Sequence, residues 1–122
     1  MVFTNYGRQA VAWALGSDIS NNYISYMAIG SGSGTPLVSQ TTLINEANRV
    51  EITGSPDFGT SLKVGFQADW NSVTMSGINL REFGVLASGV VLTGSIWQRE
   101  SFPNIVFDGT NELQVVTTLE VI

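Results

Sequence analysis

The chain has 122 residues, and its 43% hydrophobic content suits one packed domain spanning residues 1–122, which excludes general disorder. A net charge of −5 with only five Lys and Arg excludes the basic surface that binds a phosphate backbone, so we expect no nucleic-acid partner. Without His or Cys, the chain lacks the usual zinc ligands, thiol nucleophiles, disulfides and Ser-His-Asp triads, so these kinds of site are excluded and we expect no cofactor.

The N-terminal segment has the spacing of a short amphipathic helix. Apolar residues recur at intervals of three and four over residues 6–15. Thr4 or Asn5 suits the N-cap position, and Gly16 suits the C-cap. A helix of this length is unstable alone in water, so we expect one side of it to pack on the rest of the protein.

Short strands follow the helix. Aromatic and β-branched residues predict a strand at 23–29, which the Gly-rich run 30–36 ends. This run lacks the Lys of a phosphate-binding loop, so it is expected to be a connecting or contact loop. Residues 39–49 are expected to form a loop or one helical turn, and residues 50–53 a short strand.

The clearest strand pattern lies at residues 62–70. Apolar residues alternate there with Lys63, Gly65, Gln67 and Asp69. This period of two predicts that one set of side chains shares a core-facing side of the strand. The set consists of Leu62, Val64, Phe66, Ala68 and Trp70.

The second half of the chain predicts two hairpins. A strand at 78–87 turns at Ser88-Gly89 and pairs with 90–97. A last hairpin joins 104–107 to 112–122 through a turn at 108–111. The fold class is therefore mainly β, an antiparallel β-sandwich or barrel-like fold with one short N-terminal helix.

Charged residues within these segments predict a structural polar network of Glu46, Arg49 and Glu82. Glu46 and Arg49 are three residues apart, and Glu82 follows Arg81 inside an otherwise apolar strand. A carboxylate that faces a core needs a partner, which favours ion pairs or hydrogen bonds over catalysis. Paired carboxylates such as Glu100 and Glu112 also fit a small hydrolase, but the sequence gives no sign of a substrate cleft.

Several motifs resemble small virion proteins and tail-fibre N-terminal modules of tailed bacteriophages. They are YMAIGSGSGTP at 26–36, TTLINE at 41–46 with Arg49, REFGVL at 81–86 and FTNYGRQA at 3–10. The resemblance implies a non-enzymatic structural component of the virion and brings no catalytic residue. Because the N-terminus lacks a signal-peptide pattern, we expect the chain to be made in the host cytoplasm before assembly. We expect a tail, baseplate, collar or fibre-attachment protein. A capsid decoration (cement) protein and a glycan- or receptor-binding module are the alternatives.

The C-terminal strand predicts self-association. Val116 and Ile122 place apolar side chains on a face expected to be solvated, and neither Lys nor Pro protects an edge at 112–122. We expect a homo-oligomer, a trimer or a symmetric ring, that also docks on another virion protein. The candidate interface residues are Val116, Glu120, Ile122, Trp97 and Phe102.

Two further partners are considered. Exposed aromatic rings would suit a host-surface glycan. No window approaches 18 apolar residues and the N-terminus lacks a signal-peptide pattern, so we expect no membrane partner.

Overall fold

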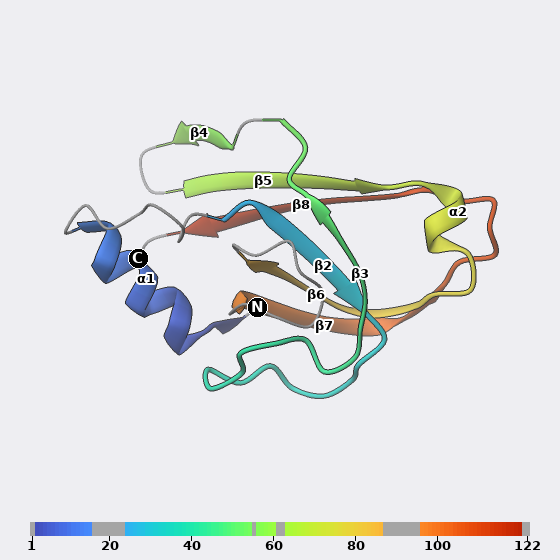
Figure 1. Cartoon of the computed structure of the whole chain (residues 1–122), viewed down its shortest axis with the longest axis horizontal. Coiled ribbons are helices and arrows are strands. Elements are labelled where there is room, and N and C mark those ends of the chain that lie inside the picture. Colours follow the sequence, from blue (N-terminus) through green and yellow to red (C-terminus); the bar gives the residue numbers. More distant parts are fainter. Residues whose placement is uncertain (1, 16–23, 55, 61–62, 87–95, 121–122) are drawn as a thin grey trace.

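Two antiparallel sheets packed face to face form the computed structural model, which describes residues 2–15, 24–54, 56–60, 63–86 and 96–120 (Figure 1). One sheet has five strands in the order β1-β7-β6-β2-β3, and the other has three in the order β4-β5-β8. The strands are β1 (Val2–Phe3), β2 (Tyr26–Gly30), β3 (Glu46–Glu51), β4 (Asp57–Thr60), β5 (Lys63–Trp70), β6 (Asn79–Leu86), β7 (Ile96–Val106) and β8 (Leu113–Glu120). The helices are α1 (Asn5–Leu15) and α2 (Ser72–Met75). The mainly β fold with a short N-terminal helix is thus confirmed.

Helix α1 is fixed to the five-stranded sheet by the residue that precedes it. The Thr4 hydroxyl oxygen accepts a hydrogen bond from Gly7 N at 3.1 Å, which satisfies one free amide of the first turn. Thr4 is fully buried, and its amide donates to Trp97 O of β7 at 2.8 Å. Tyr6 packs edge-on against the Trp97 ring, with ring centroids 6.5 Å apart. Neither α1 nor α2, the two helices of the described ranges, is long and apolar enough to cross a membrane.

The main core lies between the two sheets, where the period-two pattern of β5 predicts it. Phe66, Ala68 and Trp70 are buried and Val64 is half-buried, while Leu62 lies outside the described residues. Their partners across the β5–β8 ladder also face inward, namely Leu113, Val115, Thr117 and Leu119. From the other sheet, Met27, Ile29, Phe83 and Val85 complete this core.

The prediction of a last hairpin is wrong. Residues 104–106 belong to the end of β7, which pairs with β6 from Leu86↔Ile96 to Asn79↔Val106. Strand β8 pairs instead with β5. The turn at 108–111 therefore carries the chain from one sheet to the other. Two alternating segments around a turn look alike whether they pair with each other or with different strands. The prediction for 78–87 is right that this strand pairs with the next one along the chain, but wrong about its partner residues. Leu86 pairs with Ile96 instead of a residue near 90, and β7 runs on to Val106. The predicted turn at Ser88-Gly89 lies outside the described residues.

The predicted loop or helical turn at 39–49 is wrong at its C-terminal end. Strand β3 begins at Glu46, and Ala28 and Ile29 of β2 pair with Arg49 and Asn48. β3 is an edge strand with polar and partly exposed residues, so hydrophobic periodicity does not reveal it. The short elements β1, β4 and α2 were not predicted either. α2 begins after Asn71, whose side chain accepts a hydrogen bond from Thr74 N at 2.8 Å.

Candidate functional site

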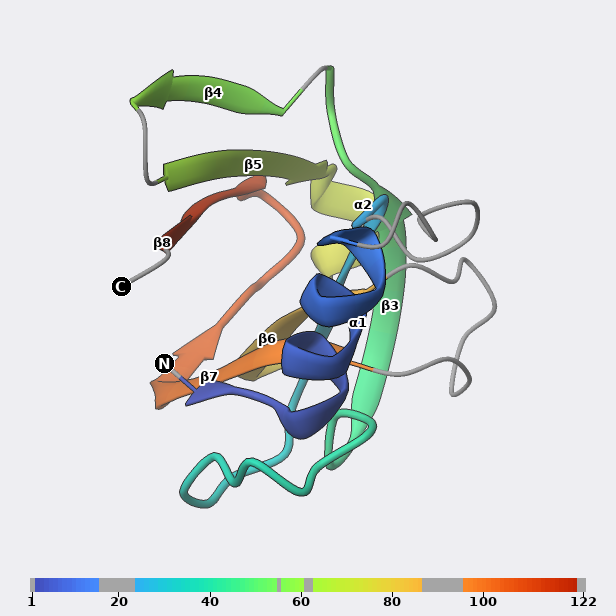
Figure 2. The ribbon, with the colours of Figure 1, turned by 90° about the vertical axis from the view of Figure 1, so that its left-hand side faces the viewer.

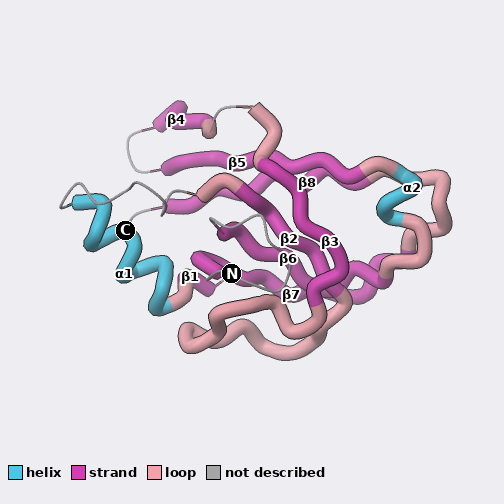
Figure 3. The backbone as a smooth tube through the Cα atoms, in the orientation of Figure 1, coloured by secondary structure: helices cyan, strands magenta, loops and turns pink. Residues whose placement is uncertain are grey.

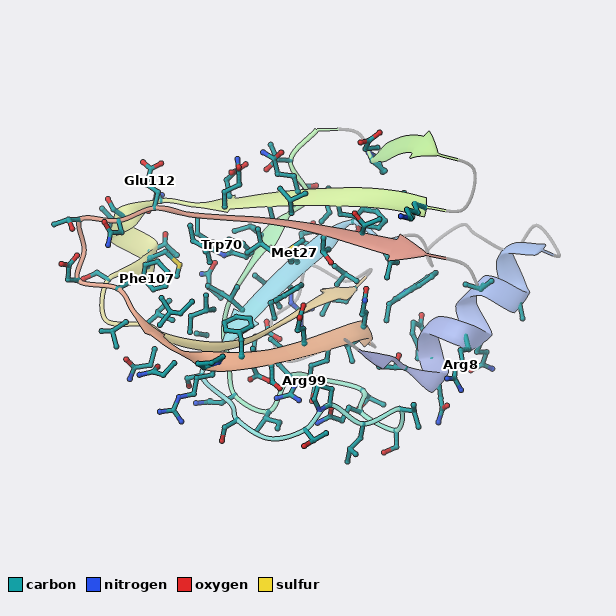
Figure 4. All side chains as sticks on the ribbon, turned by 180° about the vertical axis from the view of Figure 1, so that it is seen from behind. Arg8, Met27, Trp70, Arg99, Phe107 and Glu112 are labelled. Carbon is teal, nitrogen blue, oxygen red and sulfur yellow. The ribbon has the colours of Figure 1, made fainter. Side chains whose placement is uncertain are left out.

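Strand β6 is buried on both faces because a long loop covers the outer face of its sheet. Figure 3 shows this loop, residues 31–45, running along the side of the five-stranded sheet that faces away from β5 and β8. Ala28, Leu43, Leu86 and Ile96 form a second, smaller apolar cluster there. The same face holds Glu82 of β6 and Arg99 of β7, and Figure 4 shows Arg99 near this loop, away from Met27 and Trp70.

Glu82 and Arg99 form a fully buried ion pair. Arg99 Nε lies 2.8 Å from Glu82 Oε2, and both side chains are 0% exposed. The two residues lie on neighbouring strands, where Glu82 of β6 pairs with Ser101 and Arg99 of β7 pairs with Gly84. Two opposite charges this deep are tolerated when the remaining polar atoms are also hydrogen-bonded.

Those remaining bonds fasten the covering loop. Glu82 Oε1 accepts hydrogen bonds from Gly32 N at 3.0 Å and Asn45 N at 2.8 Å, and Oε2 accepts one from Ile44 N at 3.0 Å. Arg99 Nη1 donates to Gly34 O at 3.2 Å. We call Glu82, Arg99 and these loop backbone groups the clasp. Because the clasp holds both ends of the loop, it fixes the loop's position on the sheet.

The Gly-rich run allows the loop backbone to approach the buried pair closely. A Cβ atom at Gly32 would lie 2.5 Å from Glu82 Oε1, and one at Gly30 would overlap the Asn45 carbonyl. The amide of Gly32 is already used by Glu82. The Ile-Gly-x-Gly pattern in this sequence therefore lets the loop backbone reach a buried carboxylate.

Replacing Gly32 with Ala is expected to lower the free energy of unfolding by about 1–3 kcal/mol, the range for overpacking a filled site. The reason is that the new methyl group must displace Glu82 or the Ile44 side chain. Urea unfolding followed by circular dichroism measures the change. Gly65→Ala is the matched control, because its Cβ would meet Asp57 at an ordinary 3.5 Å. Equal effects of the two substitutions would contradict the close approach at Gly32.

The clasp also sets the ionisation of Glu82. Burial alone would raise the pKa of its carboxyl group, but the amides of Asn45 and Ile44 and the Arg99 guanidinium outweigh burial and lower the pKa below its ordinary 4.5. The group therefore remains ionised at neutral pH.

Acid is expected to destabilise the protein through Glu82. Because the folded pKa is below the unfolded one, the contribution is fully present above about pH 4.5 and is lost as pH falls through the folded pKa. Hydrogen bonds also lower the pKa of Asp69 and of Asp108, so these two carboxyl groups contribute to the same loss of stability as the pH falls. The free energy of unfolding is measured at several pH values for the parent and for Glu82→Gln. The difference between the two pH dependences gives the contribution of Glu82. If the free energy of unfolding depended on pH in the same way in parent and variant, the predicted contribution of Glu82 would be contradicted.

The predicted network of Glu46, Arg49 and Glu82 is arranged as two separate ion pairs in the described residues. Arg49 binds Glu46 through two bonds, Nε to Oε2 at 2.9 Å and Nη2 to Oε1 at 2.6 Å. Glu82 pairs with Arg99, which the sequence analysis missed. The sequence feature that could have pointed to this partner is Arg99 itself, a single Arg close to the apolar residues of the predicted strand 90–97. Arg81, the sequence neighbour of Glu82, is only half-buried.

The candidate interface residues fall in different environments. Val116 is 65% exposed on the outer face of β8, whereas Trp97 is buried in the core and its ring is unavailable to a partner. Phe102 is half-buried and packs on Phe83, with ring centroids 6.0 Å apart. Trp97 is thus corrected to a core residue, because it is buried and its ring packs edge-on against Tyr6. The side chain of Glu120 and the whole of Ile122 lie outside the part of the chain that the structure describes.

Other apolar side chains are exposed on the covering loop. Leu37, Val38 and Ile44 are each about half exposed, at 55%, 42% and 52%, and the segment 31–45 contains no charged residue. The loop is also held at Val38 O by Asn5 N and at Thr41 O by Ile96 N. It therefore presents a fixed, neutral and partly apolar surface.

Within the described ranges, no group of three or more acidic side chains is placed to hold a metal ion. All aromatic side chains that the structure describes are buried or half-buried. The sequence matches no protein-family model, and comparison with curated proteins gives no match either.

Proposed function

We propose that this chain is a non-enzymatic structural component of a tailed-phage virion, in the tail, baseplate, collar or fibre-attachment region, which acts through self-association and docking to another virion protein. The observation that carries the proposal is the clasp. Three of the phage-like motifs contribute to it: the Gly-rich run supplies Gly32 N, the segment 41–46 supplies Asn45 N, and the segment 81–86 supplies Glu82. Arg99, which lies outside these motifs, completes the clasp.

The covering loop supports docking to a protein. An interface core is poor in charge, and the loop is an uncharged segment with three exposed aliphatic side chains, Leu37, Val38 and Ile44. Because the clasp fixes the loop before binding, a partner loses little free energy in ordering it. A partner whose docking surface is neutral and apolar fits this surface best.

Purified particles provide the test of the proposal. Phage particles from infected cells, washed at high salt, are expected to contain the chain in a fixed ratio to the major structural proteins, as measured by quantitative mass spectrometry. Electron microscopy with a labelled antibody then assigns it to the tail region, or to the capsid surface if it is a decoration protein. A chain that is abundant in infected cells but missing from washed particles would overturn the proposal.

A further inference from the structure

The edges of the two sheets are protected at every strand except β8. β1 and β4 have only two and four residues, and β3 carries Glu46, Arg49 and Glu51 among its six. The part of β7 beyond β1 contains Pro103, which lacks an amide proton. β8 has eight residues with no Pro and no basic residue, and its one charge is the terminal Glu120. Short length, charge and Pro are the usual defences against edge pairing. β8 is neither short nor interrupted by Pro, and its single charge lies at its end.

Every second residue of β8 points its backbone amide and carbonyl toward an edge with which no other strand of the described residues pairs. Gln67 O of β5 accepts a bond from Thr53 N at 2.7 Å, so the backbone of Gln67 points away from β8. In an antiparallel ladder, its opposite residue Val116 then points its own amide and carbonyl away from β5. Gln114 and Thr118 share this direction because they are two residues away on either side. No described strand pairs with this edge.

The side chains around this edge are also incompletely covered. Val116 is 65% exposed, while the core-facing Val115 and Leu119 are only half-buried. On the opposite side of the molecule, the two sheets are joined by Trp70 Nε1, which donates to Asn48 Oδ1 at 3.0 Å. Figure 2 shows β7 and β8 on one side and β3 on the other. The sandwich is therefore closed along β3 and less covered along β8.

We propose that β8 pairs antiparallel with β8 of a second copy, around a two-fold axis, so that the two small sheets join in the order β4-β5-β8-β8-β5-β4. The other edges of a second copy are protected, so its β8 is the edge that fits. An axis at Thr117 places Val116 opposite Thr118 and Gln114 opposite Glu120, so no like charges meet. When β8 of one copy pairs with β8 of another, both edges are used and the assembly stops at a dimer. This differs from the trimer or ring expected from the sequence. The inference rests on the self-association in the proposed function and names its strand and symmetry.

A charge placed on the edge tests the pairing. Sedimentation equilibrium of the parent, from micromolar to near-millimolar concentration, is expected to give a dimer of twice 13.1 kDa. Val116→Lys is expected to be monomeric, with dimer affinity weakened at least about tenfold, because the edge then carries a Lys. Val73→Lys is the matched control, since Val73 is 83% exposed on α2, and it is expected to dimerise like the parent. A monomeric parent, or a Val116→Lys variant that dimerises like the parent, would overturn the proposal.

A backbone substitution tests the hydrogen bonds themselves. Thr118→Pro removes an amide that points away from β5, so the β5–β8 ladder keeps its bonds while the free edge loses a donor. This variant is expected to show the circular dichroism of the parent and the mass of a monomer. Dimers of parent affinity would overturn the pairing, and if the variant does not fold, Val116→Lys decides. The experiment on virus particles tests the proposed function independently. If the chain is monomeric but present in virions, the proposed function stands and the dimer is rejected. If the chain dimerises through β8 but is missing from virions, the dimer stands and the proposed function is rejected.

Discussion

Glu82→Gln is expected to lower the free energy of unfolding by about 3–5 kcal/mol, the cost of removing one charge from a buried pair. The amide leaves Arg99 buried without its counter-ion and carries one oxygen where the loop backbone needs two. Arg99 Nη2 already has no hydrogen-bond partner among the described groups, so little is available to compensate the charge. Urea unfolding at neutral pH, followed by tryptophan fluorescence, gives the value.

Two further variants make this result specific. Glu51→Gln removes an exposed carboxylate from β3 and is expected to change stability by less than about 0.5 kcal/mol. The double variant Glu82→Gln with Arg99→Met is expected to lose less than the sum of the two single losses, because neither charge is then left unpaired. A Glu82→Gln variant that unfolds at the same urea concentration as the parent would show that the clasp contributes nothing to stability.

Phe66→Ala is also expected to cost about 3–5 kcal/mol, as is usual for deleting a buried aromatic side chain. Phe66 lies at the centre of β5, is buried, and belongs to the core between the two sheets. Its neighbours in the rigid ladders cannot move far enough to fill the space that the ring leaves. Thermal and urea unfolding measure the loss.

The control for Phe66→Ala is Val73→Ala, which removes exposed methyl groups from α2 and is expected to stay within about 0.5 kcal/mol of the parent. A loss under about 1 kcal/mol at Phe66 would be incompatible with its burial between the sheets.

Much of β5 could be predicted because its signal is local. Phe66, Ala68 and Trp70 follow each other at a period of two, and only a strand places them on one side. The helix after Thr4 was equally readable from its cap and spacing. The need of Glu82 for a partner also followed from the apolar residues around it, since a carboxylate in such a strand is costly without one.

The partners of Glu82 could not be predicted. Arg99 is 17 residues away along the chain, Asn45 is 37 and Gly32 is 50. No local pattern connects positions at such separations, because the pairing of β2, β6 and β7 and the position of loop 31–45 on their sheet bring these groups together. The requirement for Gly at 32 appears only once the carboxylate is in place beside it.

By itself the sequence determined which segments extend and which face of each strand is apolar, because alternation acts between residues two apart. Only the tertiary structure decided which strands pair. Residues 104–106 and β8 have the appearance of a hairpin, yet they belong to different sheets. Backbone amides and carbonyls are the same in every strand, so pairing depends on which apolar faces meet in the assembled core. The same cause leaves β8 at an edge of the described sheet, and its pairing with a second copy is inferred from the backbone groups that point toward that edge.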